Sequence, residues 1–239
     1  MSNFDISDSH LRKNIRKTLG LKADQDAKSP TAHLNEAYVT QAKQFNLTTE
    51  MLSEKSIRAH FEIFEDHVNS LNKLSAELDG VNRDDVNDDD SLFRTLKVDE
   101  TYNLNAAFLH GLFFENISDI RSEISMDSLT FMRLERDFGS FDAWQKDFIA
   151  CAMSARSGWA VTVYNTFLRR YMNVCVDLYS TNIPFSSFPI IVLDCWEHSY
   201  YRDYLNERKT YVFAMMKEFD WDIIEKRVKK ADKIGKITA

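Results

Sequence analysis

Residues 194–201 read Asp-Cys-Trp-Glu-His-Ser-Tyr-Tyr and directly follow the apolar run Pro189–Leu193. A short run rich in β-branched residues indicates a buried strand. Asp194 therefore stands at a strand end, where an unpaired carboxylate is costly, so it must be paired, protonated or bound to a metal. His198 lies four residues later and can turn back to the same point. Carboxylate and imidazole ligands suit iron, manganese or zinc.

Two further histidines lie on apolar helix faces. His60 belongs to the first amphipathic helix, and His110 lies within the apolar run 106–114. Either one alone is more typical of a hydrogen-bonded core histidine than of a ligand. Together with Asp194 and His198, however, they make a candidate site with four ligands.

The pattern Asp-x-Trp-Glu-His-x-Tyr-Tyr at residues 194–201 is the signature of iron/manganese superoxide dismutases, and the chain resembles this family over about residues 50–230. Other stretches similar to the family are Leu52–Ile57, Glu135–Phe141, Ser157–Ala160, Tyr204–Tyr211 and Trp221. The resemblance implies one iron or manganese ion per chain, with a metal-free chain as the alternative. The implied ligands are His60, His110, Asp194 and His198.

The departures from the family cluster around these ligands. Where the family has a His and a Tyr, four and eight residues after the first ligand, this chain has Phe64 and Val68. His67 is adjacent, but neighbours on a helix point about 100° apart, so it is a poor substitute. The family's Gln, which hydrogen-bonds solvent at the metal, is also missing. Ala106 stands at one of its two positions, and Asn182, with a side chain shorter by one methylene, is the candidate replacement at the other.

Other family features are retained. Trp159 and Trp196 are the aromatic residues that the resemblance implies around the ligands. Glu197 and Tyr200 lie at the two-fold interface in the family, so we expect a homodimer or a heterodimer with a related chain. The partner expected for Tyr200 is the His that is replaced here by Phe64, so this contact is altered.

The periodicity predicts a helical half followed by a mixed half. Helices are expected at about 53–78, 101–118, 141–156, 210–217 and 220–234, and strands at 159–164, 172–180 and 190–194. The core residues expected in the second helix are Leu104, Phe108, Leu112 and Phe113. The fold class is α+β: by resemblance, the iron/manganese superoxide dismutase fold, with an N-terminal helical hairpin and a C-terminal three-stranded antiparallel sheet with helices. The expected domains are an N-terminal arm (1–50), the helical hairpin (51–138) and the α/β domain (139–239).

Charge is unevenly distributed along the 239 residues. The net charge is −7, yet residues 1–22 carry +3 and residues 225–239 carry +4, which leaves −14 between them. An acidic body does not indicate a free-standing nucleic-acid-binding protein. The basic ends are either solvated helical termini or contacts for RNA or an acidic partner. Residues 80–91 are acidic but lack the Gly and Glu of an EF-hand, so we expect a solvated loop.

The cysteines and the chain ends limit the remaining classes. Cys151, Cys175 and Cys195 are odd in number and not closely spaced, which argues against a disulfide framework and a Cys-x-x-Cys metal site. Cys195 is expected to be a small buried residue. No stretch approaches the roughly 20 apolar residues that span a bilayer. We expect no secretory signal, and Asp5 and Asp8 make the N-terminus a poor organelle transit peptide, but targeting stays open because translation need not start at Met1.

Two functions remain. The changes around the ligands favour a structural subunit that keeps the fold and the four ligands. The chain resembles the superoxide-dismutase-like proteins of the mitochondrial small ribosomal subunit, which implies a mitochondrial matrix location and a larger protein or ribonucleoprotein complex. The alternative is an active iron/manganese superoxide dismutase, which converts two superoxide ions to O₂ and H₂O₂. Because superoxide is an anion, an enzyme needs an open, positively biased entrance to the metal.

Overall fold

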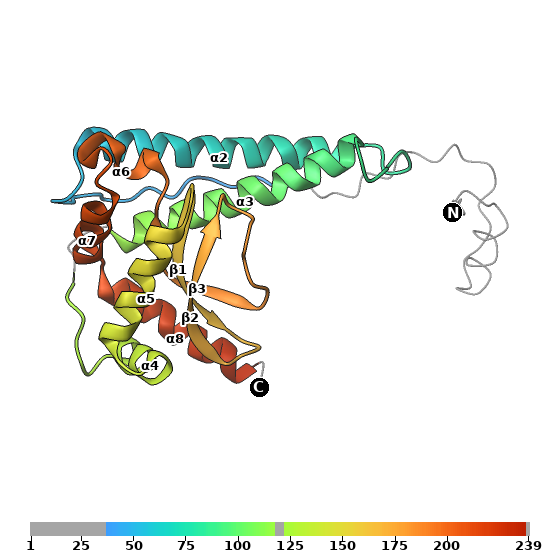
Figure 1. Ribbon diagram of the computed structural model, residues 1–239. Helices are drawn as coiled ribbons and strands as arrows, with labels where there is room; N and C mark the ends of the chain where they lie inside the picture. Colours follow the sequence, from blue (N-terminus) through green and yellow to red (C-terminus); the bar gives the residue numbers. More distant parts are fainter. Residues whose placement is uncertain (1–36, 118–121, 238–239) are drawn as a thin grey trace, which may run out of the picture. The chain divides into compact units, whose positions relative to one another are not determined.

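The computed structural model describes residues 37–117 and 122–237 (Figure 1). The first 36 residues of the predicted arm, including the basic run 1–22, lie outside the described residues. No helix in the described ranges is long and apolar enough to cross a bilayer.

Two long helices form the predicted hairpin, α2 (Glu54–Gly80) and α3 (Leu92–Asn116), which lie side by side in Figure 1. Ser53 caps α2, with its hydroxyl accepting a hydrogen bond from the backbone N–H of Ser56. Ser91 caps α3 in the same way, so this helix begins earlier than the predicted residue 101. The side-chain oxygen of an N-cap satisfies a backbone donor that the first turn of a helix leaves free.

The core face of α3 differs from the predicted one. Leu104 and Phe108 are each 50% exposed, whereas Ala106 and Phe113 are fully buried. The core prediction is therefore wrong for Leu104 and Phe108, whereas it is confirmed for Phe113, and Leu112 is partly buried. The physical reason is the rotation of α3 about its axis, which turns the face with Ala106, His110 and Phe113 towards the neighbouring elements. Leu104 and Phe108 lie two positions from Ala106, so their side chains point about 160° away from it.

The C-terminal half mixes helices with a small sheet. Its elements are α4 (Leu129–Phe138), α5 (Phe141–Ser154), β1 (Gly158–Asn165), β2 (Arg170–Asp177), β3 (Ser187–Asp194), α6 (Glu197–Tyr204), α7 (Arg208–Glu218) and α8 (Trp221–Ile237). The predicted cap of α5 is confirmed, because Ser140 accepts from the N–H of Ala143 at 3.0 Å. The sequence patterns did not predict α4 and α6.

The sheet is antiparallel with strand order β2-β1-β3, which confirms the predicted α+β architecture. Helix α5 lies against β1 and β2, while α3 and α8 contact β3. The register pairs Trp159 with Asp194, so the start of β1 lies beside the end of β3. Gly158 is required there, because a Cβ atom would lie 2.0 Å from the carbonyl oxygen of Val176.

One buried arginine joins the hairpin to the sheet. Arg227 of α8 donates to the carbonyl oxygens of Leu112 and Ile190 and to the carboxylate of Glu115. It therefore belongs to the core of the fold and not to a basic outer surface at the C-terminus. Cys195 is buried as predicted.

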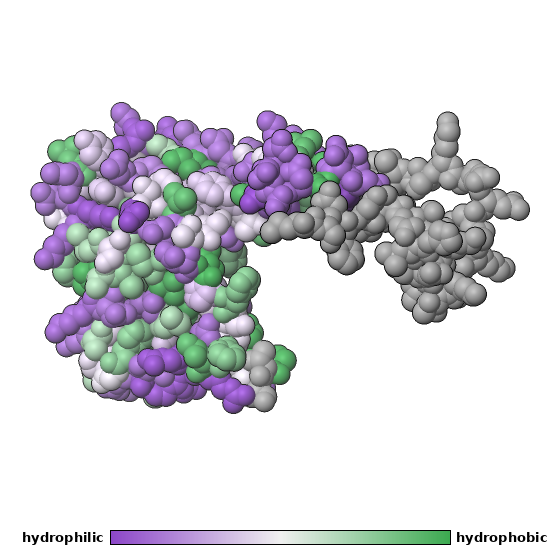
Figure 2. All heavy atoms as spheres, turned by 45° about the vertical axis from the view of Figure 1, so that its right-hand side comes forward, coloured by the Kyte–Doolittle hydropathy of each residue, from purple (hydrophilic) through white to green (hydrophobic). Residues whose placement is uncertain are grey.

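The segment before α2 and the loop after it have opposite characters. Phe45 packs its ring against Phe64 and Phe114, at centroid distances of 6.5 and 6.0 Å. Most of the acidic residues in the loop 80–91 are exposed, as expected for a solvated loop. Figure 2 shows hydrophilic residues gathered at that end of the helix pair.

Candidate metal centre

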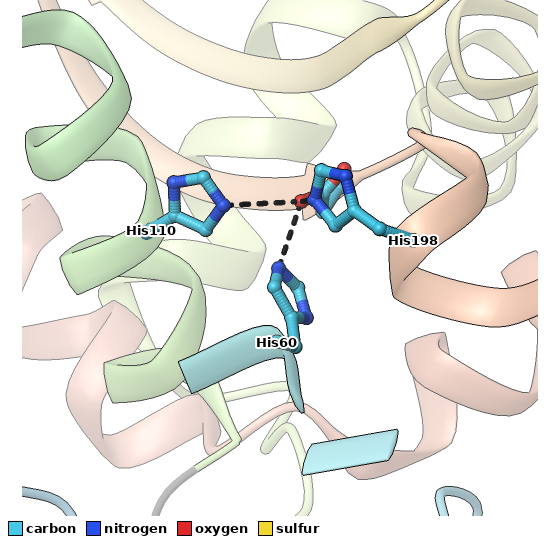
Figure 3. Close-up of side chains that lie close together, drawn as sticks. His60, His110 and His198 are labelled. Carbon is cyan, nitrogen blue, oxygen red and sulfur yellow. Dashed lines mark hydrogen bonds and ion pairs between the residues drawn. The ribbon is translucent and has the colours of Figure 1, made fainter. Parts of the chain in front are cut away.

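The fold brings the four predicted ligands to one point (Figure 3). His60 comes from the second turn of α2, His110 from α3, Asp194 from the last position of β3 and His198 from the second position of α6. One candidate ligand atom from each lies within 4.8 Å of those of the other three. Because the hairpin supplies two residues and the C-terminal half the other two, an ion held here would join both halves.

One carboxylate oxygen stands at the centre of the group. Oδ2 of Asp194 lies 3.0 Å from Nε2 of His60, 3.1 Å from Nε2 of His198 and 3.7 Å from Nε2 of His110. The other oxygen, Oδ1, accepts a hydrogen bond from the backbone N–H of Trp196 at 2.8 Å. The backbone thus orients the carboxylate, and the three imidazole Nε2 atoms face it.

Burial and charge set the protonation states that a metal requires. Burial lowers the pKa of His60 and lowers that of His110 well below its usual value, so both rings are neutral. Burial alone would raise the pKa of Asp194, but the charge of His198 and hydrogen bonds from His198 and His60 hold it well below its usual range. Metals bind neutral imidazole and ionised carboxylate, and His60, His110 and Asp194 are in these forms.

The tautomer of His110 provides a test of fit. Its Nδ1 lies 2.7 Å from the carbonyl oxygen of Ala106, so this nitrogen carries the proton and Nε2 keeps its lone pair. Nε2 is buried and has no hydrogen-bond partner among the described residues. Buried polar atoms are nearly always partnered, so a lone pair directed at three other ligands fits a mononuclear iron or manganese ion.

Apolar residues, including Phe64 at an altered family position, lie on one side of the site. Phe64 is buried with its ring 6.3 Å from that of His110, while Phe113 and Phe114 lie 5.1 and 5.0 Å from the ring of His60. We call Phe64, Phe113 and Phe114 the apolar side. Val68 and Ala106 are also buried. Aromatic and aliphatic packing therefore fills these positions.

A second group of aromatic and polar residues lies on another side, and sequence reasoning missed it. His67, Tyr102 and Tyr179, which we call the polar side, have ring centroids 4.9 to 6.2 Å apart. The ring of His67 lies 5.5 Å from that of His110, and Tyr179 lies 5.8 Å from it. A signal was present for His67: seven residues make two helical turns, so it shares a face with His60.

The two expected tryptophans are in place. The Trp159 ring lies 5.0 Å from that of His110, edge to face, and Trp196 stacks on His198 at 5.7 Å. Both indole Nε1 atoms are buried and have no hydrogen-bond partner within the described ranges. They are donors without an acceptor at the edge of the site.

The remaining predicted residues lie further out. Asn182 is exposed and donates to Asp177 at 3.4 Å, so it cannot replace the missing Gln. Its place beside the ligands is taken by Tyr179. Glu197 is exposed at the start of α6, and Tyr200 is buried with its ring 5.2 Å from that of Tyr211. Their role at a two-fold interface stays a prediction.

Comparison with known proteins agrees with this geometry. Residues 128–227 match the C-terminal domain of iron/manganese superoxide dismutases. The chain is 32% identical over 188 residues to the iron superoxide dismutase of Aquifex pyrophilus, covering 77% of this chain and 87% of that protein. It is 40% identical over 122 residues to manganese superoxide dismutase 2 of Haloferax volcanii, covering 51% and 60% respectively. The chain belongs to the iron/manganese superoxide dismutase family.

Proposed function

We propose that this protein is a mononuclear iron- or manganese-dependent superoxide dismutase. The observation that carries the proposal is the convergence of three imidazole Nε2 atoms on the ionised carboxylate of Asp194, in a site assembled from four separate elements. The names of the relatives support it, since they are superoxide dismutases. A bound ion would supply the redox chemistry, accepting one electron from a first superoxide, which leaves as O₂, and giving it to a second, which takes up two protons to form H₂O₂.

The chain's own residues would hold and orient the site. The carbonyl oxygen of Ala106 fixes the proton of His110 on Nδ1, and the N–H of Trp196 orients Asp194. The backbone carbonyl oxygen of Asp194 accepts from the hydroxyl of Tyr211 at 2.8 Å, which anchors the strand end. Changing such partners of the ligands typically lowers metal affinity by about 10- to 100-fold. The side chain of His198 is 22% exposed, which leaves one approach to the site.

A structural role is the second candidate, and the apolar side favours it. Phe64 and Val68 are buried where the resemblance implies a His and a Tyr, and Ala106 is buried at one of the two positions where it implies a Gln. In this case the fold and an ion would serve as a rigid unit in a mitochondrial assembly such as the small ribosomal subunit. The associated proposals are a homodimer or heterodimer with a related chain, a larger protein or ribonucleoprotein complex, and a matrix location.

One sample can decide between the two candidates. We would measure iron and manganese by elemental analysis and superoxide consumption on the same purified protein, with Asp194→Ala as the matched variant. The dismutase proposal expects about one ion per chain and a turnover that Asp194→Ala abolishes. A loaded protein without turnover, found with the small ribosomal subunit in a density gradient of mitochondrial extract, would establish the structural role.

A further inference from the structure

The connection between β2 and β3 directs Tyr179 into the fold. Leu178 adopts a positive φ of 54° and is 45% exposed, while the next residue, Tyr179, is only 3% exposed. The N–H of Leu178 donates to the carbonyl oxygen of Ser157 at 2.7 Å, and the N–H of Thr181 donates to that of Asp177. A left-handed residue held on both sides by backbone hydrogen bonds makes a fixed turn. The conformation of this turn therefore holds the side chain of Tyr179 inside the fold.

Tyr179 packs against residues of the ligand group and against the two tryptophans beside it. Its ring stacks on Trp196 at 5.3 Å, and Trp196 in turn stacks on His198. The ring also lies 5.8 Å from His110 and 6.0 Å from Trp159. The phenol hydroxyl of Tyr179 is a hydrogen-bond donor.

Unused donors gather where Tyr179 meets the site. The indole Nε1 atoms of Trp159 and Trp196 are buried, and neither has a partner in the described part of the chain. Buried donors normally have an acceptor, so two such donors on rings that pack against Tyr179 indicate a place for a small acceptor, either water or an anion. Superoxide belongs to this chemical class.

His67 lies between this group and the surface. Its Nδ1 is 2.9 Å from Oδ1 of Asn103, whose amide nitrogen donates to the carbonyl oxygen of Asp99, so the amide orientation is set and Nδ1 carries the proton. That leaves Nε2 of His67 as an acceptor. The ring lies 5.0 Å from that of Tyr179 and is partly exposed.

We propose that Tyr179 is the hydrogen-bond donor to the small anion or water held beside the metal, and that His67 positions it from the solvent side. This inference rests on the proposed dismutase function, because it assigns the polar contact that the apolar side lacks. Tyr179 touches the bound species, and His67 acts through Tyr179. The polar side thus supplies the hydrogen bond to the bound species. Phe64, Val68 and Ala106 cannot supply it, because their side chains have no hydrogen-bonding group.

The test compares Tyr179→Phe with Tyr164→Phe, in iron- or manganese-loaded full-length protein. Tyr164 is a buried tyrosine at the opposite end of β1 from Trp159, so its variant removes a phenol hydroxyl away from the site. The readouts are metal content, azide affinity from the visible spectrum, and superoxide consumption. We expect Tyr179→Phe to keep its metal and to weaken azide binding by about tenfold, as expected when a hydrogen bond to a charged group is lost. Tyr164→Phe should match the wild type.

His67 supplies a separate arm of the same experiment. We expect His67→Leu to weaken azide binding by about threefold, and His67→Gln, which keeps an acceptor, to restore it. If the loaded Tyr179→Phe protein binds azide as tightly as the wild type, the inference about Tyr179 is overturned. The proposed dismutase function is not affected by that result. A loaded wild type that binds azide in a Tyr179-dependent way but consumes no superoxide would overturn the proposed function alone. A wild type that takes up neither metal would overturn both.

Discussion

The two sides of the metal centre differ in how they are built. The apolar side consists of Phe64, Phe113 and Phe114, all from the helical hairpin, and Phe45 packs on it from the preceding segment. The polar side combines His67 and Tyr102 of the hairpin with Tyr179 from the connection between β2 and β3. The first side offers packing and excludes water; the second offers hydrogen bonds and access. The polar residues beside the ligand group are therefore gathered on one side of it.

This difference teaches that ligands and their surroundings can change independently. The ligands sit on a strand end and on helix positions that the backbone fixes, as the 2.7 Å contact between His110 and its own helix illustrates. The surrounding residues need only occupy a neighbouring volume with suitable chemistry. A site judged solely by residues at familiar positions would be classed as degraded, although other elements can supply donors.

The largest expected effect separates ligands from neighbours. His110→Ala removes an Nε2 atom from the ligand group, whereas His67→Ala removes a nearby imidazole that is not a predicted ligand. Because changes in partners of the ligands alone can alter metal affinity by about 10- to 100-fold, His110→Ala should lower metal content by more than about tenfold. His67→Ala should retain its metal. Equal loss in both variants, measured by elemental analysis, would erase the distinction between ligand and polar side.

The apolar side should dominate stability. Phe64→Ala removes a buried ring that contacts Phe45, Phe61 and Phe114, so we expect a loss of about 3 kcal/mol in the free energy of unfolding. Denaturant unfolding of metal-free protein measures it. Phe185→Ala is the matched control, because its ring is 97% exposed and the change should be nearly neutral.

Tyr179→Phe sharpens the same comparison, since it keeps the ring and deletes only the hydroxyl. It should cost less than about 1 kcal/mol of the unfolding free energy, because only one hydrogen-bonding group is removed. A stability loss as large as that of Phe64→Ala would mean that both sides serve packing, and the division between them would fail.

The smallest effect concerns a contact away from both sides. Glu225 of α8 accepts hydrogen bonds from the N–H groups of Leu129 and Thr130, at 3.3 and 2.8 Å, at the start of α4. Burial alone would raise the pKa of Glu225, but these bonds and the Thr130 hydroxyl lower it. Its ionised form therefore stabilises the fold at pH values above the unfolded pKa of about 4.3, and this stabilisation is lost as pH falls through the lower folded pKa.

Glu225→Gln should accordingly be less stable than the wild type by about 1 kcal/mol at neutral pH, and the difference should disappear in acid. Unfolding measured across pH 2 to 7, with the exposed Glu62→Gln as control, checks this (about one pH unit per step suffices). Metal content should stay unchanged, because Glu225 contacts neither side of the site. A shift in metal content would show that the remote scaffold also controls the centre.

Local sequence patterns were enough to predict the candidate ligands and most of the helices and strands. The motif at residues 194–201 and the two histidines in apolar helices identified the four residues that converge, because each sits at a helix or strand position with a regular direction. Ser53 and Ser140 marked helix starts for the same local reason. The short helices α4 and α6 lack a long apolar stripe, so periodicity did not reveal them.

By itself, then, the sequence determined the ligand set, the three strands and the order of helical and mixed halves, since these depend on spacing along the chain. Only the tertiary structure decided what surrounds the ligands. The direction of Tyr179 depends on a positive φ at Leu178, and the exposure of Leu104 depends on how α3 rotates against its neighbours. Both are consequences of packing between segments far apart in the sequence, which a local pattern does not encode.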